Sequence, residues 1–157
     1  MCVITLDEID LDILRELQSD GRLTNQALAD RVGLSPSPCL RRVRRLEAEG
    51  AIAGYRATVD AAAVGLAITA FARLKLVRHT PEVVDGVEQA LRDTPEVVEA
   101  HLLAGDDDYM AKITVGSFAE YEVLLRRAIR PIPGLGAITT TFAFGVTKSP
   151  SPLPLGR

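Results

Sequence analysis

The sequence predicts an α+β protein with two domains, and three observations support that fold class. Residues 1–60 contain three short amphipathic segments, each preceded by a residue suited to cap a helix. Residues 61–148 alternate strand-like and helix-like segments in the order βαββαβ. Residues 149–157 have proline at every second position from 150 to 154, which is typical of a flexible tail. We therefore expect a helical domain, a sheet domain and a loose proline-rich tail.

The composition is that of a folded protein from a reducing compartment. The 157 residues are 47% hydrophobic with a net charge of −3, which excludes intrinsic disorder. No apolar run reaches the roughly 20 residues that a bilayer requires. The two cysteines, Cys2 and Cys39, cannot form a disulfide framework, and with the two histidines they lie at no zinc-ligand spacing. We expect a cytoplasmic protein without membrane span, metal or cofactor. The acidic balance still allows a local basic face.

Two short helices are expected at the start of the chain. Asp7 is suited to cap the first, its early residues are rich in acid, and Gly21 ends it. Thr24 caps the second helix, which Gly33 ends. Both helices carry one apolar face, so they are expected to pack against each other and against a third element.

A third helix follows after a turn of only a few residues, as a helix-turn-helix requires. Ser35 is its expected N-cap, Pro36 suits the first helical position, and the helix runs to about Glu49. Beyond it, Ala51–Val59 is interpreted as two short strands about Gly54 that form a small wing, with a plain connector as an equally good alternative. Residues 1–60 are thus predicted to form a winged helix-turn-helix domain.

Four arginines within five residues make the third helix strongly basic. They are Arg41, Arg42, Arg44 and Arg45. We take the direction of the core from Leu40, Val43 and Leu46. At about 100° per residue, Arg41 and Arg45 then point away from the core, and the other two arginines flank them. The helix is therefore expected to carry an exposed basic ridge.

This ridge favours binding to double-stranded DNA. The planar guanidinium group pairs with guanine edges and phosphates, and the hydroxyls of Ser35 and Ser37 lie where a recognition helix meets the DNA backbone. A solvated helix face is the alternative, but such faces usually mix Arg with Glu at i,i+4 spacing, and here Glu47 and Glu49 come only at the end. We therefore predict that the two serines and the four arginines contact DNA.

The second domain is expected to contain four strands and two helices. The strands are Leu66–Val77, Val97–Ala104, Tyr109–Val115 and Ala137–Val146, and the helices are Pro81–Arg92 and the segment from Ser117 to Ile129. This order predicts a ferredoxin-like fold, an antiparallel sheet with both helices on one face. The alternation predicts that the other face is apolar as well, so a second copy of the chain is its simplest cover.

Two blocks of the sequence resemble the Lrp/AsnC family of transcription regulators. Residues 6–60 (LDEIDLDILRELQSDGRLTNQALADRVGLSPSPCLRRVRRLEAEGAIAGYRATVD) are similar to the family's DNA-binding half. Residues 105–109 (GDDDY), followed by Lys112, are similar to the loop between the second and third strands of its effector-sensing half. The resemblance implies a RAM-type second domain and a homodimer that assembles into higher oligomers, with an octamer as one such assembly. It also implies an amino acid or related metabolite bound between dimers.

The resemblance places the effector site at this loop. The residues that it implies are Ala104, Gly105, Asp106, Asp108 and Thr140. Amides of a tight turn at Gly105 can donate to a carboxylate, and Asp106 or Asp108 can accept from an ammonium group. Family members often have threonine at the positions of Ala104 and Ile138, so the identity of the effector stays open. An acidic turn chosen for backbone reasons is the alternative.

Two other functional classes compete with a regulator. A metal-dependent enzyme would hold magnesium with Asp106–Asp108, but adjacent residues point in different directions, and no partnered nucleophile, base or phosphate cradle completes a site. A metabolite-sensing oligomer that acts through protein partners would not need the arginine ridge. We therefore predict a sequence-specific DNA-binding regulator, not an enzyme, that responds to a small effector such as an amino acid.

Overall fold

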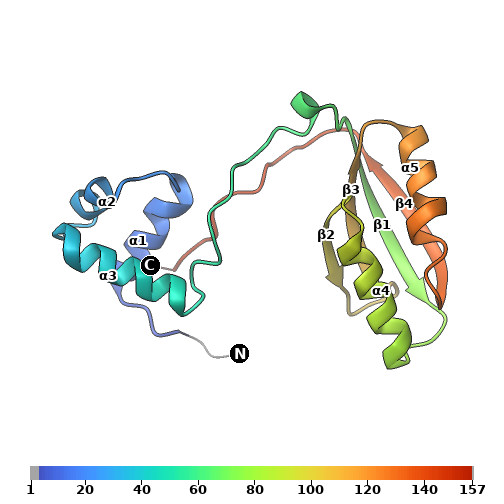
Figure 1. The fold of residues 1–157 in the computed structure, drawn as a ribbon, viewed down its shortest axis with the longest axis horizontal. Coiled ribbons are helices and arrows are strands. Elements are labelled where there is room, and N and C mark those ends of the chain that lie inside the picture. The colour runs from blue at the N-terminus through green and yellow to red at the C-terminus, as the bar shows by residue number, and fades with distance from the viewer. Residues whose placement is uncertain (1–3, 157) are drawn as a thin grey trace. The chain divides into compact units, whose positions relative to one another are not determined.

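The computed structural model describes residues 4–156, which form two compact units. The first unit contains residues 4–58 together with 148–156, and the second is Val59–Thr147 (Figure 1). The chain therefore passes between the units twice. Cys2 lies outside the described residues. None of the helices among the described residues is long and apolar enough to cross a membrane.

The first unit is built from three helices around a small core. They are α1 (Glu8–Ser19), α2 (Asn25–Arg31) and α3 (Pro36–Ala48) (Figure 1). The fully or nearly buried apolar side chains are Ile13, Leu14, Leu28, Ala29, Cys39 and Leu46. Each predicted helix is present, with ends within about two residues of the expected ones, because cap and glycine signals mark the helix ends directly in the sequence.

The N-caps behave as predicted in two of the three helices. Asp7 Oδ1 accepts from the Asp10 amide at 2.8 Å, and Asp10 Oδ2 accepts from the Asp7 amide at 3.2 Å, which completes a capping box. Thr24 Oγ1 accepts from the amide of Ala27 at 3.2 Å. Ser35 occupies the cap position of α3, but its hydroxyl makes no capping hydrogen bond. That hydroxyl remains available to another partner.

The two strands expected within Ala51–Val59 are not formed. Among the described residues this segment begins with bends and continues without a strand or a helix. Its fixed points lie at the end of α3, where the Ile52 amide donates to Leu46 O at 3.1 Å and Tyr55 Oη donates to Glu47 at 3.1 Å. A two-stranded ladder needs a second backbone in register, and the segment does not supply one to itself.

The proline-rich tail contacts α1, whereas the sequence predicted a loose tail. The Leu153 amide donates to Gln18 Oε1 at 2.6 Å, and Gln18 Nε2 donates back to Leu153 O at 3.4 Å. Arg15 Nη2 donates to Gly156 O at 2.7 Å, and Leu155 packs against the helical core. The tail forms no helix or strand, but its alternating leucines and free backbone groups give it apolar and polar contacts.

The second unit has the predicted βαββαβ order. Its elements are η1 (Ala62–Val64), β1 (Ile68–Leu76), α4 (Pro81–Asp93), β2 (Val97–Leu102), β3 (Tyr109–Val115), α5 (Phe118–Leu124), η2 (Leu125–Ile129) and β4 (Leu135–Ala143). The strands form one antiparallel sheet in the order β2-β3-β1-β4. This is the ferredoxin-like topology, so the predicted fold class is confirmed.

The core of this unit lies between the sheet and its two helices. Every second residue of β1, from Ala70 to Leu76, is buried and faces α4 and α5, which lie on the same side of the sheet (Figure 1). The strand β4 begins two residues earlier than predicted, directly after Gly134, whose φ of +82° only glycine adopts readily. A Cβ on Gly134 would lie 2.5 Å from Val83 Cγ1, so the close approach of α4 also requires glycine.

The face of the sheet opposite the helices is mixed, not apolar in alternation as the sequence suggested. Its residues on β1, β3 and β4 include Phe71, Arg73, Lys75, Met110, Lys112, Thr139 and Thr141. Phe71 lies between Lys112 and Thr141 in the register. The aromatic ring is therefore surrounded by polar side chains, which reduces the apolar area that this face offers.

Candidate nucleic-acid interface and effector loop

The turn between α2 and α3 is held by two hydrogen bonds. Asn25 Nδ2 donates to Pro36 O at 2.9 Å, and the Leu34 amide donates to Ala29 O at 2.9 Å. Gly33, with φ of +69°, lets the chain reverse within this short distance. The start of α3 is thereby fixed to α2, which is the geometry that a recognition helix requires.

The buried side of α3 differs from the one that the helical wheel predicted. Cys39 and Leu46 are fully buried, whereas Leu40 is 38% exposed. Since Leu40 does not face the core, the predicted core direction was rotated toward it. With Cys39 in its place, the most exposed side of the helix is centred on Ser37, Arg41 and Arg44.

Arg45 therefore does not point away from the core as predicted. Its Nη2 contacts Asp10 Oδ2 of α1, and Arg42 Nη1 lies 2.8 Å from Asp10 Oδ1 and 2.7 Å from Asp7 Oδ2. The helical wheel missed these contacts because a long arginine side chain reaches sideways to a carboxylate on the neighbouring helix. Two of the four arginines are engaged inside the unit.

The carboxylate that holds these arginines is almost completely buried. The Asp10 side chain is 1% exposed, and its two oxygens accept from Arg42, Arg45 and the Asp7 amide. The pKa of Asp7 is lowered, first by the hydrogen bond from the Asp10 amide and then by Arg42. The two carboxylates raise the pKa of Arg42 in return. The cluster is a set of mutually satisfied charges.

The remaining polar groups of α3 face solvent. Within residues 4–156, Arg41 and Arg44 are exposed and form no ion pair or hydrogen bond. Ser35 and Ser37 are exposed at the start of the same helix. The structure thus brings together two available guanidinium groups and two hydroxyls on one helix, which can contact phosphates and base edges.

The loop between β2 and β3 is closed by Asp108. The Asp108 amide donates to Leu74 O at 2.9 Å, and the Leu103 amide donates to Asp108 O at 2.8 Å. Its side chain accepts from the Leu76 amide at 2.7 Å and lies 2.6 Å from His79 Nε2. These two donors, the amide first, lower the pKa of Asp108. Contrary to the sequence-based expectation, both Asp108 oxygens are occupied, so this residue anchors the loop.

The other two aspartates of the loop point elsewhere. Asp107 Oδ2 lies 3.6 Å from Arg73 Nε, and the backbone carbonyl of Asp106 accepts from Lys75 Nζ. The carboxylate of Asp106 is exposed and has no partner among residues 4–156. The three carboxylates therefore do not converge on one point, and no group of three or more potential metal ligands gathers in the part of the chain that the structure describes.

Gly105 is not required by the fold of the isolated chain. Its φ lies outside the left-handed region, and a Cβ there would meet no atom within 4 Å. Ala104 beside it is exposed as well. The tip of the loop thus leaves its backbone open to solvent, unlike Gly134, where glycine fills a packed position.

Thr140 is not brought to this loop within one chain. It pairs with Ala72 in the sheet and faces the helices, where its Oγ1 lies 2.5 Å from Tyr121 Oη. The alternation of side chains along β4 explains the difference, because Thr139 and Thr141 face the opposite side. The expected free hydroxyl at position 140 is therefore already engaged with α5.

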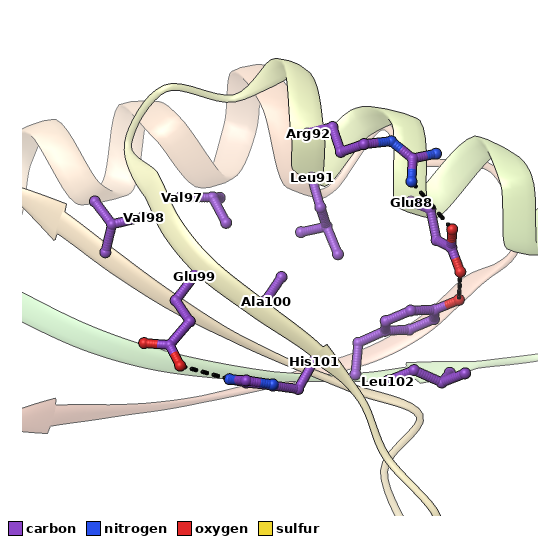
Figure 2. Close-up of a pocket in the computed structure, with 10 residues that line it drawn as sticks. Glu88, Leu91, Arg92, Val97, Val98, Glu99, Ala100, His101 and Leu102 are labelled. Carbon is purple, nitrogen blue, oxygen red and sulfur yellow. Dashed lines mark hydrogen bonds and ion pairs between the residues drawn. The ribbon is translucent and has the colours of Figure 1, made fainter. Parts of the chain in front are cut away.

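A groove of about 380 Å³ between α4 and β2 was not predicted from the sequence (Figure 2). Leu91 and Ala100 lie between the helix and the strand, while Glu99 and His101 pair at 2.6 Å on the other side of β2 (Figure 2). Glu88 of α4 pairs with Arg92 at 3.2 Å and accepts from Tyr109 Oη at 3.4 Å. The groove exists because α4 leaves the edge strand uncovered, which no pattern within β2 reveals.

Comparison with known proteins places both units in one family. Residues 6–53 match the model of a winged helix-turn-helix DNA-binding domain, and residues 69–153 match that of the Lrp/AsnC ligand binding domain. The chain is 42% identical over 135 residues to the leucine-responsive regulatory protein of Escherichia coli K12. This alignment covers 86% of this chain and 82% of that protein. The chain belongs to the Lrp/AsnC family.

Solved structures of two transcription regulators have the same fold. A transcriptional regulator of Neisseria meningitidis in complex with L-Met aligns with a TM-score of 0.89 at 33% identity, covering 96% of this chain and 97% of that one. An AsnC family regulator of Agrobacterium tumefaciens aligns with the same TM-score and identity, covering 95% and 97%. This Lrp/AsnC protein is thus a transcription regulator with one DNA-binding and one ligand-binding domain.

Proposed function

We propose that this Lrp/AsnC regulator reads duplex DNA with the exposed side of α3 and that an amino acid bound at the Gly105 loop changes its affinity for DNA. The observation that carries the proposal is the pair Arg41 and Arg44, which have no partner within residues 4–156 and lie on a helix whose start is fixed by a short turn. A regulator of chromosomal DNA works where the DNA is, so the prediction of a cytoplasmic protein is retained.

The DNA contacts proposed are Arg41, Arg44, Ser35 and Ser37. The arginines extend from the solvent side of the helix, and the serine hydroxyls lie at its N-terminal end, where phosphates are favoured by the helix dipole. Neutralising a phosphate releases a condensed counterion and makes binding dependent on salt. Two related recognition helices in a homodimer would enter successive major grooves about 10 bp apart.

A salt titration tests this interface. The logarithm of the DNA association constant is plotted against the logarithm of salt concentration for wild type, Arg41→Ala and Arg44→Ala. Each substitution should reduce the slope by about 0.9 if the arginine contacts a phosphate, or relax base preference by about 1–3 kcal/mol if it reads a base. Arg31→Ala is the control, because Arg31 pairs with Glu16 on another helix at 2.7 Å. Wild-type behaviour of both α3 variants would overturn the interface.

The effector site is proposed at the tip of the β2–β3 loop. Amides at Ala104 and Gly105 are open to a ligand carboxylate. The Asp106 carboxylate, which has no partner in the described part of the chain, suits a ligand ammonium group. The relatives support an amino acid as effector, since one is named leucine-responsive and another was solved with L-Met. Asp108 and His79 would hold the loop in place, and Thr140 would take part only after leaving Tyr121.

Calorimetry with L-Leu and L-Met tests the site. We expect heat of binding from wild type and a loss of about tenfold in affinity, about 1.4 kcal/mol, in Asp106→Ala. Asp107→Ala is the matched control, because it removes the same charge from the same loop but from a carboxylate that faces Arg73. Equal affinity in all three proteins would place the ligand elsewhere.

The proposed assembly is a homodimer that associates further, with an octamer as one candidate. Phe71 and Met110 on the open face of the sheet and the exposed side chains of Val98 and Leu102 on β2 support two separate contact surfaces. The exposed fractions of Val98 and Leu102, 56% and 68%, are high for apolar residues. Sedimentation at micromolar concentration tests this assembly, and a monomer at that concentration would contradict it.

A further inference from the structure

We propose that Asp10 is a positioning residue of the DNA-binding unit. By holding two arginines, it limits the number of cationic groups that the recognition helix offers to DNA, and this favours specific over non-specific binding. The feature behind this proposal is a cluster of four charged side chains between α1 and α3. Its members are Asp7, Asp10, Arg42 and Arg45.

Asp10 is the centre of this cluster. Its carboxylate is 1% exposed and contacts Arg42 through one oxygen and Arg45 through the other, while the arginines are 28% and 43% exposed. The Asp7 carboxylate also holds Arg42, at 2.7 Å. The cluster contains two positive and two negative charges, so it is formally neutral. A buried carboxylate with this many donors keeps both arginines in one geometry.

The helix then offers fewer charges than its sequence contains. Of four arginines in five residues, Arg41 and Arg44 have no partner in residues 4–156, Arg42 is held by two carboxylates, and Arg45 is half-exposed and held through Nη2. The rest of the Arg45 guanidinium can face DNA only in the orientation that Asp10 allows. A guanidinium group held in one orientation can form paired hydrogen bonds with a base edge, whereas a mobile arginine contacts any phosphate.

Non-specific affinity grows with the number of phosphates that a protein neutralises, each contributing about 0.9 to the salt slope. Release of Arg42 and Arg45 from Asp10 would therefore add sequence-independent contacts. It would also loosen the orientation of Arg45. Both effects lower the ratio of specific to non-specific affinity. The added positive charge strengthens binding to any DNA and does not restore this ratio.

The test compares full-length Asp10→Asn with Asp12→Asn. Both variants remove one negative charge from α1, but Asp12 is exposed and pairs with Arg15 on the same helix at 2.5 Å, away from α3. Two probes are used: a duplex that the wild-type protein selects from a randomised pool, and bulk duplex DNA of mixed sequence. Affinity for each is measured over a range of salt, with circular dichroism confirming that the helices are folded.

We expect Asp10→Asn to steepen the salt slope on mixed-sequence DNA by about one to two and to lower the specific to non-specific ratio by about tenfold or more. Asp12→Asn should leave both near wild-type values. If Asp10→Asn weakens binding to both probes with an unchanged slope, or matches Asp12→Asn, Asp10 serves only the fold and the proposal is overturned.

Arg42→Ala and Arg41→Ala provide a second test that does not depend on the folding of Asp10→Asn. Arg42→Ala should leave the slope unchanged, because its charge is already compensated, whereas Arg41→Ala should lower it. An equal reduction in both variants would overturn the proposal. This inference rests on the DNA interface proposed above, and an unchanged slope in Arg41→Ala would contradict that interface instead.

Discussion

Two groups of aspartates, one in each unit, show how differently the same residue type is used. At the start of α1, Asp10 is buried and all its acceptors are filled by arginines and an amide. In the β2–β3 loop, Asp106 is exposed and its carboxylate has no partner in residues 4–156. The first group stabilises a helix interface, and the second leaves an acceptor for a ligand. Charge counted along a sequence does not distinguish these cases.

The physical difference is desolvation. A carboxylate removed from water must be paired, and breaking such a pair leaves an uncompensated charge. An exposed carboxylate is solvated and contributes little to stability. Substitutions in the first group should therefore act on folding, whereas substitutions at the tip of the loop should act on binding alone.

The largest effect on stability is expected from Asp10→Ala. Removal of this carboxylate leaves Arg42 and Arg45 without their buried partner, which should lower the free energy of unfolding by about 2–3 kcal/mol, less than for fully buried pairs because the arginines are partly exposed. Asp12→Ala should change it by less than about 0.5 kcal/mol. Urea denaturation of both variants measures this difference, and equal midpoints would contradict it.

Gly134 and Gly105 give the same contrast between a packed position and the open tip of the loop. Gly134→Ala should cost about 2 kcal/mol, because it combines a φ of +82° with a Cβ that would meet Val83 at 2.5 Å. Gly105→Ala should leave the thermal unfolding midpoint unchanged, since nothing lies within 4 Å of its Cβ, and should weaken binding of the amino acid. A large loss of stability in Gly105→Ala would mean that the loop tip serves the fold.

Asp108 is intermediate between buried Asp10 and exposed Asp106, and its role should be visible in the pH dependence of stability. Its pKa is lowered in the folded protein by the Leu76 amide and His79, so its contribution to stability is complete above the unfolded pKa of about 4 and is lost as the pH falls toward the folded value. The side-chain amide of Asp108→Asn is neutral and cannot take up this proton as the pH falls. Its stability should therefore fall less steeply than that of wild type below about pH 4. Parallel thermal unfolding curves against pH would refute this role.

The smallest expected effect is that of the tail. Deletion of residues 149–157 removes the Gln18 and Leu153 hydrogen bonds and the contact of Leu155 with the helical core. We expect a loss of only about 1 kcal/mol from the first unit, because these hydrogen bonds are exposed to solvent and Leu155 is only partly buried. An unchanged unfolding transition of that unit would show that the tail contributes nothing to it.

The sequence predicted the elements better than their contacts. Caps at Asp7 and Thr24 and the alternation along β1 depend on local patterns, so the helices, the four strands of the sheet and their topology were predicted correctly. The predicted core side of α3 is wrong because Leu40 is exposed, and only packing against the other helices shows that Cys39 is buried in its place. The missing wing strands and the docked tail were missed for a related reason. A strand needs a paired backbone, and the tail needs the side chains of Gln18 and Arg15, which lie far from it in the sequence.

The loop that we propose as the effector site was singled out by its motif, but the contacts of its individual residues were not predicted. Three consecutive aspartates look alike in sequence, yet Asp108 closes the loop and Asp107 faces Arg73, whereas the Asp106 carboxylate has no partner among residues 4–156. Thr140 was assigned to the site, and its pairing with Tyr121 across the sheet could not be seen before α5 was placed. Side-chain partners contributed by other elements therefore decide which residues of a motif can bind a ligand.

We propose that an amino acid changes the affinity of this Lrp/AsnC protein for DNA through the loop that the fold leaves open. The most direct measurement is fluorescence anisotropy of a labelled duplex, selected by the wild-type protein, titrated with wild type and Asp106→Ala in the presence and absence of L-Leu or L-Met. At least one of these amino acids should shift the wild-type binding curve. In Asp106→Ala the shift should be lost or should require a higher concentration of the amino acid. Wild-type curves that coincide with and without both amino acids would contradict it.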